Sequence, residues 1–315
     1  MKLLFVVHRS WPFQGGSEVY VDAMATECKI RGHDVSVFAG EHQGSYNGIR
    51  VTSDTNILLE QHDLIIVHGA GPQLQNFVLT NATRIPSKIV YMIVRPSHSA
   101  VCIKAMHECA YLGFSTLEDQ DYLKQYGVSS KGVEIRHGIK HLDSIGKPGF
   151  KEKYGIKGKM FLSCGGYWPN KALPELSAIF EQHGPEDSTL VLTGYDNRYN
   201  IMPHETSRVK PLMIQDKNDV MSAMSEAEAV IMHSTSEGFG LVLLEAMINK
   251  TPWIAREIAG AKLLKNYGST YTTDQGLIDI FNNFNSMNHD VESAYNYVCN
   301  NHLISSTIDD IEKIR

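Results

Sequence analysis

Short, continuously apolar segments alternate with helix-like segments along the whole chain, and this alternation limits the fold more than any other feature. A first series of apolar segments covers residues 3–7, 35–38, 64–67, 89–94 and 111–114, and a second covers 160–163, 189–192, 229–232 and 253–255. Uninterrupted apolar runs of this length are typical of strands buried on both faces. Between them, segments such as 17–32 carry an apolar helical face. The pattern predicts parallel sheets wrapped by helices.

The two series predict two doubly wound α/β domains that face a cleft. The break between them falls in a Gly- and Lys-rich stretch that includes Gly146-Lys147-Pro148-Gly149, a strong interruption of regular structure. We therefore expect an N-terminal domain over residues 1–146 and a C-terminal domain over 147–290. Residues 291–315 are expected to form a terminal helix that can cross back to the first domain. Ligands of such sheets bind at the carboxyl ends of the strands.

Composition narrows the class of protein further. No apolar run among the 315 residues approaches the roughly 20 residues of a membrane span. The apolar opening ends at His8-Arg9, which suits a first strand better than a signal peptide. The five cysteines are scattered without a C-x-x-C pair, as in proteins of a reducing compartment. We expect a soluble, cytoplasmic protein.

A glycine pair follows the first predicted strand. Gly15 and Gly16 precede Ser17 and Glu18 at the start of the first predicted helix. Glycines let the backbone approach a ligand, and a helix start offers N–H groups to an anion. Ser17 is equally a good helix cap. The pair is a moderate indication of ligand binding, and it is not the G-x-G-x-x-G fingerprint of nicotinamide binding.

A second loop-to-helix transition carries two acids. Residues 233–247 follow an apolar run and read H-S-T-S-E-G-F-G-L-V-L-L-E-A-M. Gly238 and Gly240 keep the first part as a loop, and the N–H groups from Gly240 onward suit a diphosphate. Glu245 suits two ribose hydroxyls. Glu237 suits a sugar hydroxyl or positive charge developing at an anomeric carbon.

These residues resemble the signature of retaining GT-B glycosyltransferases of family 4. The most specific match is the E-x7-E pair of Glu237 and Glu245 within S-x-x-E-G-F-G-L-x-x-L-E-A-M. Shorter stretches agree with it: the Gly15-Gly16 loop and the segments 31–35, 63–68, 113–115 and 251–255. The resemblance covers most of the chain and implies the GT-B fold. This fold has two Rossmann-like domains, and the second holds most of the nucleotide-sugar donor.

The resemblance also implies an activity and a set of roles. It implies transfer of a hexose or pentose from a nucleotide diphosphate sugar to an acceptor hydroxyl, with retention of configuration, no metal and no other cofactor. Glu237 would contact the transferred sugar and Glu245 the ribose. The remaining residues on the donor side would be Gly15, Gly16, Lys171, Gly238, Phe239, Gly240 and Leu241. Lys171 would offset the charge of the leaving diphosphate, as a metal does elsewhere.

The chain departs from the family at three places. The arginine expected before the lysine is replaced by Gly166. Arg136-His137-Gly138 stands in place of the interdomain P-N-G segment. The sugar-contacting histidine after the fifth strand has two candidates, Arg95 and His98. One fewer cation on the leaving diphosphate is expected to weaken donor binding unless another basic residue substitutes.

Two further features have competing interpretations. Asp119-Gln120-Asp121 spells D-x-D, but it follows a Ser/Thr start typical of a capping box, and we interpret it as helix capping. His68 ends a predicted strand, and with His137 it is a candidate for the acceptor side; a structural role for His68 is equally consistent.

The charge distribution is consistent with more than one class of acceptor. The net charge of −6 gives no general attraction to nucleic acid, yet residues 124–159 carry nine Lys and Arg against three acids. A solvated face is the simpler interpretation of this basic segment, and contact with a phosphate-bearing acceptor is the alternative. A saccharide or small molecule is the leading acceptor, and a hydroxymethylated DNA base is the second. A nucleotide-sugar epimerase and a non-catalytic nucleotide-sugar binder are the other functions consistent with the sequence.

Overall fold

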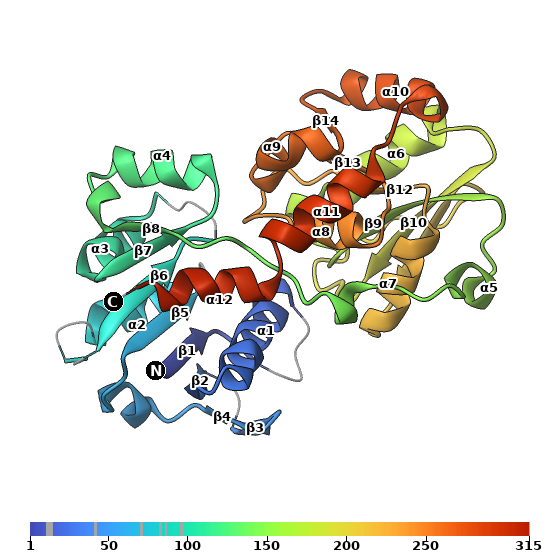
Figure 1. Ribbon diagram of the computed structural model, residues 1–315. Coiled ribbons are helices and arrows are strands. Elements are labelled where there is room, and N and C mark those ends of the chain that lie inside the picture. The colour runs from blue at the N-terminus through green and yellow to red at the C-terminus, as the bar shows by residue number, and fades with distance from the viewer. Residues whose placement is uncertain are drawn as a thin grey trace. The chain divides into compact units, whose positions relative to one another are not determined.

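The computed structural model describes residues 1–10, 15–40, 43–69, 72–81, 84–85, 87–94 and 98–314, and it divides into two units (Figure 1). Unit 1 contains Met1–Gly138 and Leu303–Arg315, and unit 2 contains Ile139–His302. Each unit is built on its own sheet, with helices connecting the strands. The two doubly wound α/β domains predicted from the sequence are confirmed.

Unit 1 holds an eight-stranded sheet in the order β3-β4-β2-β1-β5-β6-β7-β8. Among the described residues its strand pairs are parallel, except for the antiparallel pair of β3 and β4. Its strands are β1 (Lys2–Val7), β2 (Asp34–Ala39), β3 (Gly44–Tyr46), β4 (Ile49–Thr52), β5 (Leu64–His68), β6 (Lys88–Met92), β7 (Tyr111–Phe114) and β8 (Gly132–Glu134). Its helices are α1 (Gly16–Ile30), α2 (Pro72–Asn81), α3 (Ala100–Glu108), α4 (Leu117–Gln125) and α12 (Ile304–Glu312).

Unit 2 holds a six-stranded parallel sheet in the order β11-β10-β9-β12-β13-β14. Its strands are β9 (Lys159–Cys164), β10 (Ser188–Gly194), β11 (Val209–Met213), β12 (Ala229–Met232), β13 (Trp253–Arg256) and β14 (Ser269–Tyr271). Its helices are α5 (Phe150–Tyr154), α6 (Leu173–His183), α7 (Lys217–Glu226), α8 (Leu241–Ile248), α9 (Gly260–Leu264), α10 (Asp274–Asn283) and α11 (Val291–Asn301).

The central strands are buried because helices cover both faces of each sheet. In unit 2, alternate residues of one strand enter two different cores: Val230 and Met232 pack with α7 and α8, and Ala229 and Ile231 pack with α6 and α10. In unit 1, β1 is buried from Leu3 to Val7. These are the apolar runs that mark the strands in the sequence, and burial of each large apolar side chain contributes about 1.5–3 kcal/mol.

The strand order reverses once in each sheet. In unit 2, β10 follows β9 on one side and β12 lies on the other, so the switch point lies between β9 and β12. In unit 1 the corresponding point lies between β1 and β5. Ligands of doubly wound sheets bind outside the carboxyl ends of the strands at this point. The loops after β9 and β12 are therefore the first place to look for a site.

The boundaries between the units differ from those expected. The structure divides the chain at residues 138/139 rather than 146/147, because residues 139–146 are held by unit 2. Ile139 lies in a core of unit 2. The Asn249 side chain accepts from the Gly146 N–H at 2.7 Å and donates to the Ser144 carbonyl at 2.6 Å.

The C-terminal segment forms two helices instead of the single helix expected for residues 291–315. α11 packs on α8 in unit 2, and α12 packs on α1 in unit 1. The interruption falls at His302 and Leu303, after which Ile304, Ile308 and Ile311 form a buried stripe on α12. The crossing back to the N-terminal unit therefore begins at Leu303.

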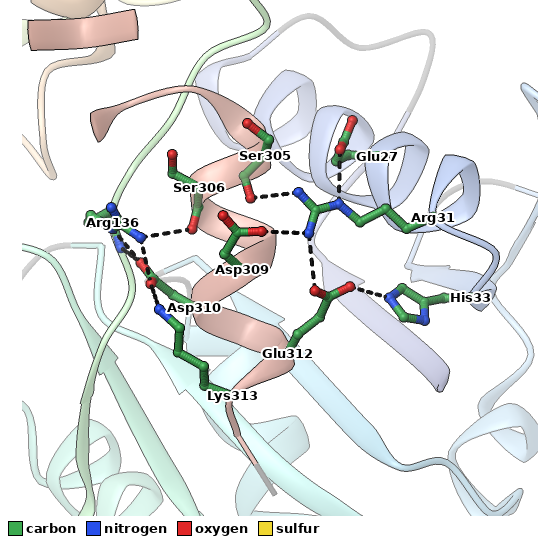
Figure 2. Close-up of polar contacts among 10 residues, drawn as sticks. All are labelled: Glu27, Arg31, His33, Arg136, Ser305, Ser306, Asp309, Asp310, Glu312 and Lys313. Carbon is green, nitrogen blue, oxygen red and sulfur yellow. Dashed lines mark hydrogen bonds and ion pairs between the residues drawn. The ribbon is translucent and has the colours of Figure 1, made fainter. Parts of the chain in front are cut away.

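Two arginines attach α12 to unit 1 from opposite sides (Figure 2). Arg31, at the end of α1, contacts Asp309 at 2.7 Å and Glu312 at 3.1 Å. Arg136 binds the buried Asp310 through both of its carboxylate oxygens at 2.8 Å. These contacts join residues more than 170 positions apart in the sequence.

Within the described part of the chain, no helix has the length and apolar character needed to cross a membrane.

Candidate functional site

A lysine and a glutamate meet at the switch point of unit 2. Lys171 Nζ lies 2.6 Å from Glu237 Oε1, and the Ser234 hydroxyl donates to the same oxygen at 2.6 Å. Lys171 comes from the segment after β9, and Ser234 and Glu237 come from the loop after β12. The lysine and glutamate side chains are 17% and 10% exposed, so the pair is shielded but still reachable from solvent.

Backbone contacts hold the two loops together. Pro169–Lys171 forms a short 3-10 turn, which presents the lysine just before α6 begins. The Thr235 N–H donates to the Asn170 carbonyl at 2.8 Å, and the Asn170 side chain donates to the Ser236 carbonyl at 3.0 Å. The position of Lys171 relative to Glu237 is thus fixed by the loops as well as by the ion pair.

Gly240 turns the loop into α8. Its backbone is left-handed, with φ +91°, and a Cβ here would lie 2.8 Å from the sulfur of Met232. Both constraints favour glycine. The helix then begins at Leu241, and Glu245 follows on its second turn. The sequence therefore predicted the loop-to-helix transition and the place of both acids correctly.

Glu245 lies in a poorly hydrated environment beside one cation. Its side chain is 19% exposed, and Lys217 Nζ lies 3.6 Å from Oε1. Burial raises the pKa of Glu245, and the charge of Lys217 partly offsets that effect. Burial also raises the pKa of the Cys164 thiol to about 12, and the charges of Glu245 and Lys171 act on the same thiol. Cys164 is the last residue of β9.

Gly166 has no room for a side chain. A Cβ at this position would lie 2.6 Å from Nε1 of Trp168, whose indole packs edge-on against Tyr195. An arginine at position 166 would have to displace that indole. Packing in the turn between β9 and α6 therefore disfavours, at position 166, the arginine that the resemblance leads us to expect.

Phe239 is a packing residue rather than part of an accessible loop. Its ring is 3% exposed and lies 5.7 Å from the ring of His302. Its carbonyl accepts from the Gly260 N–H at 3.0 Å. Its neighbours Gly238 and Gly240 are partly exposed, and so is Leu241. Of these four residues predicted on the donor side, three therefore have accessible atoms and Phe239 anchors the loop.

The glycine pair of unit 1, and not Ser17, stands at the start of α1, so the expectation of Ser17 as the helix cap is wrong. Gly15 is the residue before the helix and Gly16 begins it. The carboxylate of Glu18 folds over this helix start, so that a Cβ on Gly15 would lie 2.3 Å from Glu18 Oε2. Glu18 is 6% exposed and pairs with Arg9 at 3.3 Å. An anion approaching these N–H groups would meet a carboxylate already in place.

His68 and His137 lie against the same tyrosine in unit 1. The Tyr20 ring is 5.1 Å from the ring of His68 and stacks on His137 at 5.0 Å. The two histidines are 2% and 4% exposed, and burial lowers the pKa of His68 to about 4. The structure brings them together, and their burial favours a packing role over direct contact with an acceptor.

The other candidates of unit 1 are placed only in part. His98 is exposed just before α3, and its Nδ1 lies 2.6 Å from the Tyr126 hydroxyl. Arg95 lies outside the described residues. Asp119 and Thr116 form a capping box at the start of α4, which confirms helix capping as the use of the D-x-D sequence.

The basic segment 124–159 is divided between the two units. Residues 124–138 belong to unit 1 and 139–159 to unit 2. Carboxylates or backbone carbonyls bind six of its nine cations: Lys124, Lys131, Arg136, Lys140, Lys151 and Lys153. Most cations of the segment therefore have a partner within the protein.

Sequence reasoning missed several residues around the pair. Ser234 is only one letter of the 233–247 motif, and the sequence gives no signal for Asn170 or for the contact of Lys217 with Glu245. His233 and Arg256 were not recognised either, although each stands at the carboxyl end of a predicted strand. That position is the signal that would have found them, since ligands of such sheets bind at this edge.

The arrangement places a cation and two carboxylates along one edge of a parallel sheet. Lys171 can bind an anion, Glu237 can accept hydroxyl protons or face positive charge, and Glu245 can bind a pair of hydroxyls. Together these groups suit a ligand that carries both phosphate and hydroxyl groups.

Comparison with known proteins agrees with this chemistry. Residues 151–284, within unit 2, match the family described as Glycosyl transferases group 1. No curated protein matches the chain in sequence. Over 99% of this chain, the structure resembles HepE from Anabaena in complex with UDP-glucose, with a TM-score of 0.81, 18% identity and 98% of that chain covered.

Two synthases share the same architecture over 99% of this chain. One is the UDP-forming α,α-trehalose-phosphate synthase from Burkholderia xenovorans, with a TM-score of 0.78, 13% identity and 99% of that chain covered. The other is the sucrose-phosphate synthase from Thermosynechococcus elongatus, with a TM-score of 0.75, 14% identity and 94% of that chain covered. The chain thus has the GT-B fold, and the family match within unit 2 supports a glycosyltransferase.

Proposed function

We propose that this protein transfers a hexose or pentose from a nucleotide diphosphate sugar to an acceptor hydroxyl, with retention of the anomeric configuration and without a metal ion. The observation that carries the proposal is the Lys171–Glu237 pair at the switch point of unit 2, with Glu245 on the adjoining helix. HepE, whose structure is similar, was solved with UDP-glucose bound. That likeness supports a nucleotide-sugar donor.

In the proposed reaction the bond between the anomeric carbon and the diphosphate oxygen breaks. A bond from the anomeric carbon to the acceptor oxygen forms on the same face, and the acceptor proton passes to the leaving diphosphate. No protein nucleophile or base is needed, because the leaving group takes the proton. Lys171 stabilises the negative charge that develops on the diphosphate, which is the role that a metal has in other enzymes.

The ion pair has a consequence for donor binding. Without donor, Lys171 is neutralised by Glu237. A bound diphosphate competes for the ammonium group, which frees the Glu237 carboxylate to face the transferred sugar. Glu245 holds the ribose hydroxyls, and its low hydration strengthens those hydrogen bonds.

A saccharide or other small molecule is the proposed acceptor. The alternative of a DNA base depended on the basic segment 124–159, and most of its cations are bound within the protein. In unit 1, His98 is exposed and has one ring nitrogen bound to Tyr126, which makes it a better candidate for acceptor contact than the buried His68 and His137. The five cysteines are free thiols, which supports a cytoplasmic location.

Donor binding is tested by thermal shift with UDP-, GDP-, ADP- and TDP-sugars. At 100 times its dissociation constant a ligand adds about 2.7 kcal/mol of stability, enough to raise the melting temperature visibly. We expect one nucleotide class to stabilise the protein, and Glu245→Ala to abolish the shift. Glu292→Ala is the matched control, since that carboxylate is on α11 in the same unit and is 65% exposed. No shift with any nucleotide contradicts the proposal.

Turnover separates a transferase from a binder or an epimerase. With the donor found above and a panel of sugar and small-molecule acceptors, we expect a glycoside whose anomeric configuration, read by NMR coupling constants, matches that of the donor. Glu237→Gln should lower kcat by about 10²-fold or more with a smaller effect on donor affinity. Inversion at the second carbon without acceptor would identify an epimerase, and binding without any turnover would identify a non-catalytic binder.

A further inference from the structure

Three side chains meet where β12, β13 and β14 end. His233 is the first residue after β12, Arg256 is the last of β13 and Tyr271 is the last of β14. Arg256 Nη2 lies 3.0 Å from His233 Nε2, and His233 Nδ1 lies 2.5 Å from the Tyr271 hydroxyl. The imidazole and phenol rings are stacked, and the guanidinium lies 5.8 Å from the centre of the phenol ring.

The hydrogen bonds fix the protonation of this cluster. A guanidinium only donates, so His233 Nε2 accepts from Arg256, and Nδ1 carries the proton and donates to Tyr271. Burial and the charge of Arg256 lower the pKa of His233 to about 4, so the ring is neutral at physiological pH. His233 therefore orients Arg256 without neutralising it.

Arg256 keeps unused capacity for an anion. Its nearest carboxylate, Asp274 on α10, is 60% exposed and lies 3.4 Å from Nη2, a long contact for a charge-assisted bond. The Nε–H of Arg256 is buried and has no hydrogen-bond partner. By contrast, Arg136 in unit 1 uses Nε and Nη2 on both oxygens of one carboxylate. A buried donor without a partner on a charged group leaves a hydrogen bond that a water, an ion or a ligand can supply.

The cluster adjoins the site already described. His233 is followed directly by Ser234, whose hydroxyl binds Glu237, and Glu237 binds Lys171. Strand register pairs Met232 with Ala255, so His233 and Arg256 stand at the next step along the same edge of the sheet. Position 166, where the resemblance leads us to expect an arginine, is a glycine, and the Trp168 indole occupies the space of a side chain there.

We propose that Arg256, oriented by His233, is the second cation of the donor site and hydrogen-bonds a phosphate oxygen of the donor diphosphate. This inference rests on the proposed function, since it assumes a diphosphate donor at the Lys171–Glu237 pair. His233 is a positioning residue, which holds the guanidinium through Nε2 and does not contact the donor itself.

The test compares diphosphates with uncharged nucleosides on the full-length protein. The probes are UDP, GDP, ADP, the corresponding nucleosides and inorganic pyrophosphate, with dissociation constants measured by calorimetry. We expect Arg256→Gln to weaken binding of the preferred nucleoside diphosphate and of pyrophosphate about 10- to 100-fold, and to leave the nucleoside unaffected. Arg256→Lys keeps the positive charge but lacks the planar guanidinium, so its dissociation constants for diphosphates should lie between those of the wild type and those of Arg256→Gln.

The matched control is Lys250→Gln. Lys250 is a paired cation of the same unit, but it precedes β13 and so lies at the opposite edge of the sheet. His233→Phe keeps a ring to stack on Tyr271 and removes the acceptor for Arg256, so it should weaken diphosphate binding but not nucleoside binding. His233→Gln can still accept a hydrogen bond and should retain more of the affinity.

Each outcome decides the question. If the wild type binds diphosphates and Arg256→Gln, shown to be folded by circular dichroism, binds them equally well, the inference is wrong and the proposed function stands. Equal weakening of nucleoside and diphosphate would show that Arg256 only supports the fold around α10, which also overturns it. If the wild type binds neither diphosphates nor pyrophosphate, both proposals fall.

Discussion

Glu245 is a carboxylate on a helix whose other residues are almost all apolar. Five of the eight residues of α8 are buried, and the glutamate itself is 19% exposed. Because its environment raises its pKa, the folded protein binds its proton more tightly than the unfolded chain does. As pH rises above the ordinary glutamate pKa of 4.5, the unfolded state ionises first and stability is lost.

Replacing this group should therefore stabilise the protein while damaging the site. We expect Glu245→Gln to melt at a higher temperature than the wild type at pH 7, and the difference to disappear well below pH 4.5, where both chains carry a neutral side chain. Differential scanning fluorimetry across pH 3 to 8 measures the difference in melting temperature between the two chains. A variant that is less stable at pH 7 would show that the bond to Lys217 outweighs burial.

At this scale the sequence names candidate residues but not their contacts. The resemblance singles out Glu237, Glu245 and Lys171, and their roles stay predictions. The contact between Lys171 and Glu237 spans 66 positions and depends on the order of β9 and β12 in the sheet, which no local pattern contains. Burial of Phe239, His68 and His137 likewise follows from packing by distant segments.

Among the elements, the buried strands were the easiest to predict. The apolar runs at 3–7, 64–67 and 229–232 each correspond to a central strand. The strands that sequence reasoning missed, β3, β4, β8, β11 and β14, are three to five residues long and lie at or next to the edges of the sheets. An edge strand is paired on one side only, so it does not need a continuous apolar run.

The attachment of α12 supplies a prediction about one buried ion pair. Burial of Asp310 raises its pKa, but hydrogen bonds from the Arg136 side chain and backbone and from Lys313 outweigh burial and hold the pKa below its ordinary value. Asp310 therefore stabilises the fold above the ordinary aspartate pKa of 3.8, and this contribution is lost as pH falls through the folded-state pKa.

Removing the arginine should leave a buried carboxylate without its main partner. We expect Arg136→Gln to lower the free energy of unfolding by about 2–4 kcal/mol at pH 7, measured by urea denaturation, and by less below pH 4. Adding Asp310→Asn to this variant should restore part of the loss, because an amide needs no cation. Lys313→Gln, at a side chain that is 70% exposed, should change stability by about 0.5 kcal/mol or less. Equal losses of unfolding free energy in Arg136→Gln and Lys313→Gln would contradict this explanation.

For the whole molecule, the sequence predicted two domains but not where the chain passes between them. Gly146-Lys147-Pro148-Gly149 is a strong local interruption, yet Asn249 binds this region to unit 2. The true crossings, at 138/139 and 302/303, have little local signature. They lie together in space, since the Ile139 N–H donates to the His302 carbonyl at 2.9 Å.

This arrangement predicts separate effects of shortening the chain. A protein ending at His302 lacks α12 and exposes the surface that Ile304, Ile308 and Ile311 cover, which removes several kcal/mol from unit 1. Unit 2 keeps all of its residues. We expect hydrogen exchange to accelerate in β1, β5 and α1 and to stay unchanged in β9 and β12. A chain ending at Glu312 is the control, and uniform loss of protection in both units would refute the prediction.

The insertion of unit 2 between two parts of unit 1 also sets the order in which the protein can be completed during synthesis. The ribosome makes the strands of unit 1 first, but α12, which packs on α1 in the same unit, emerges only after all of unit 2. At 5–20 residues per second, translation of the 164 residues of unit 2 takes about 8–33 seconds, and the early sheet waits for that time. Unit 2 can fold as soon as its own sequence has left the ribosome. The first unit begun is thus completed only after the second, and during that interval its uncovered apolar surface is available to chaperones.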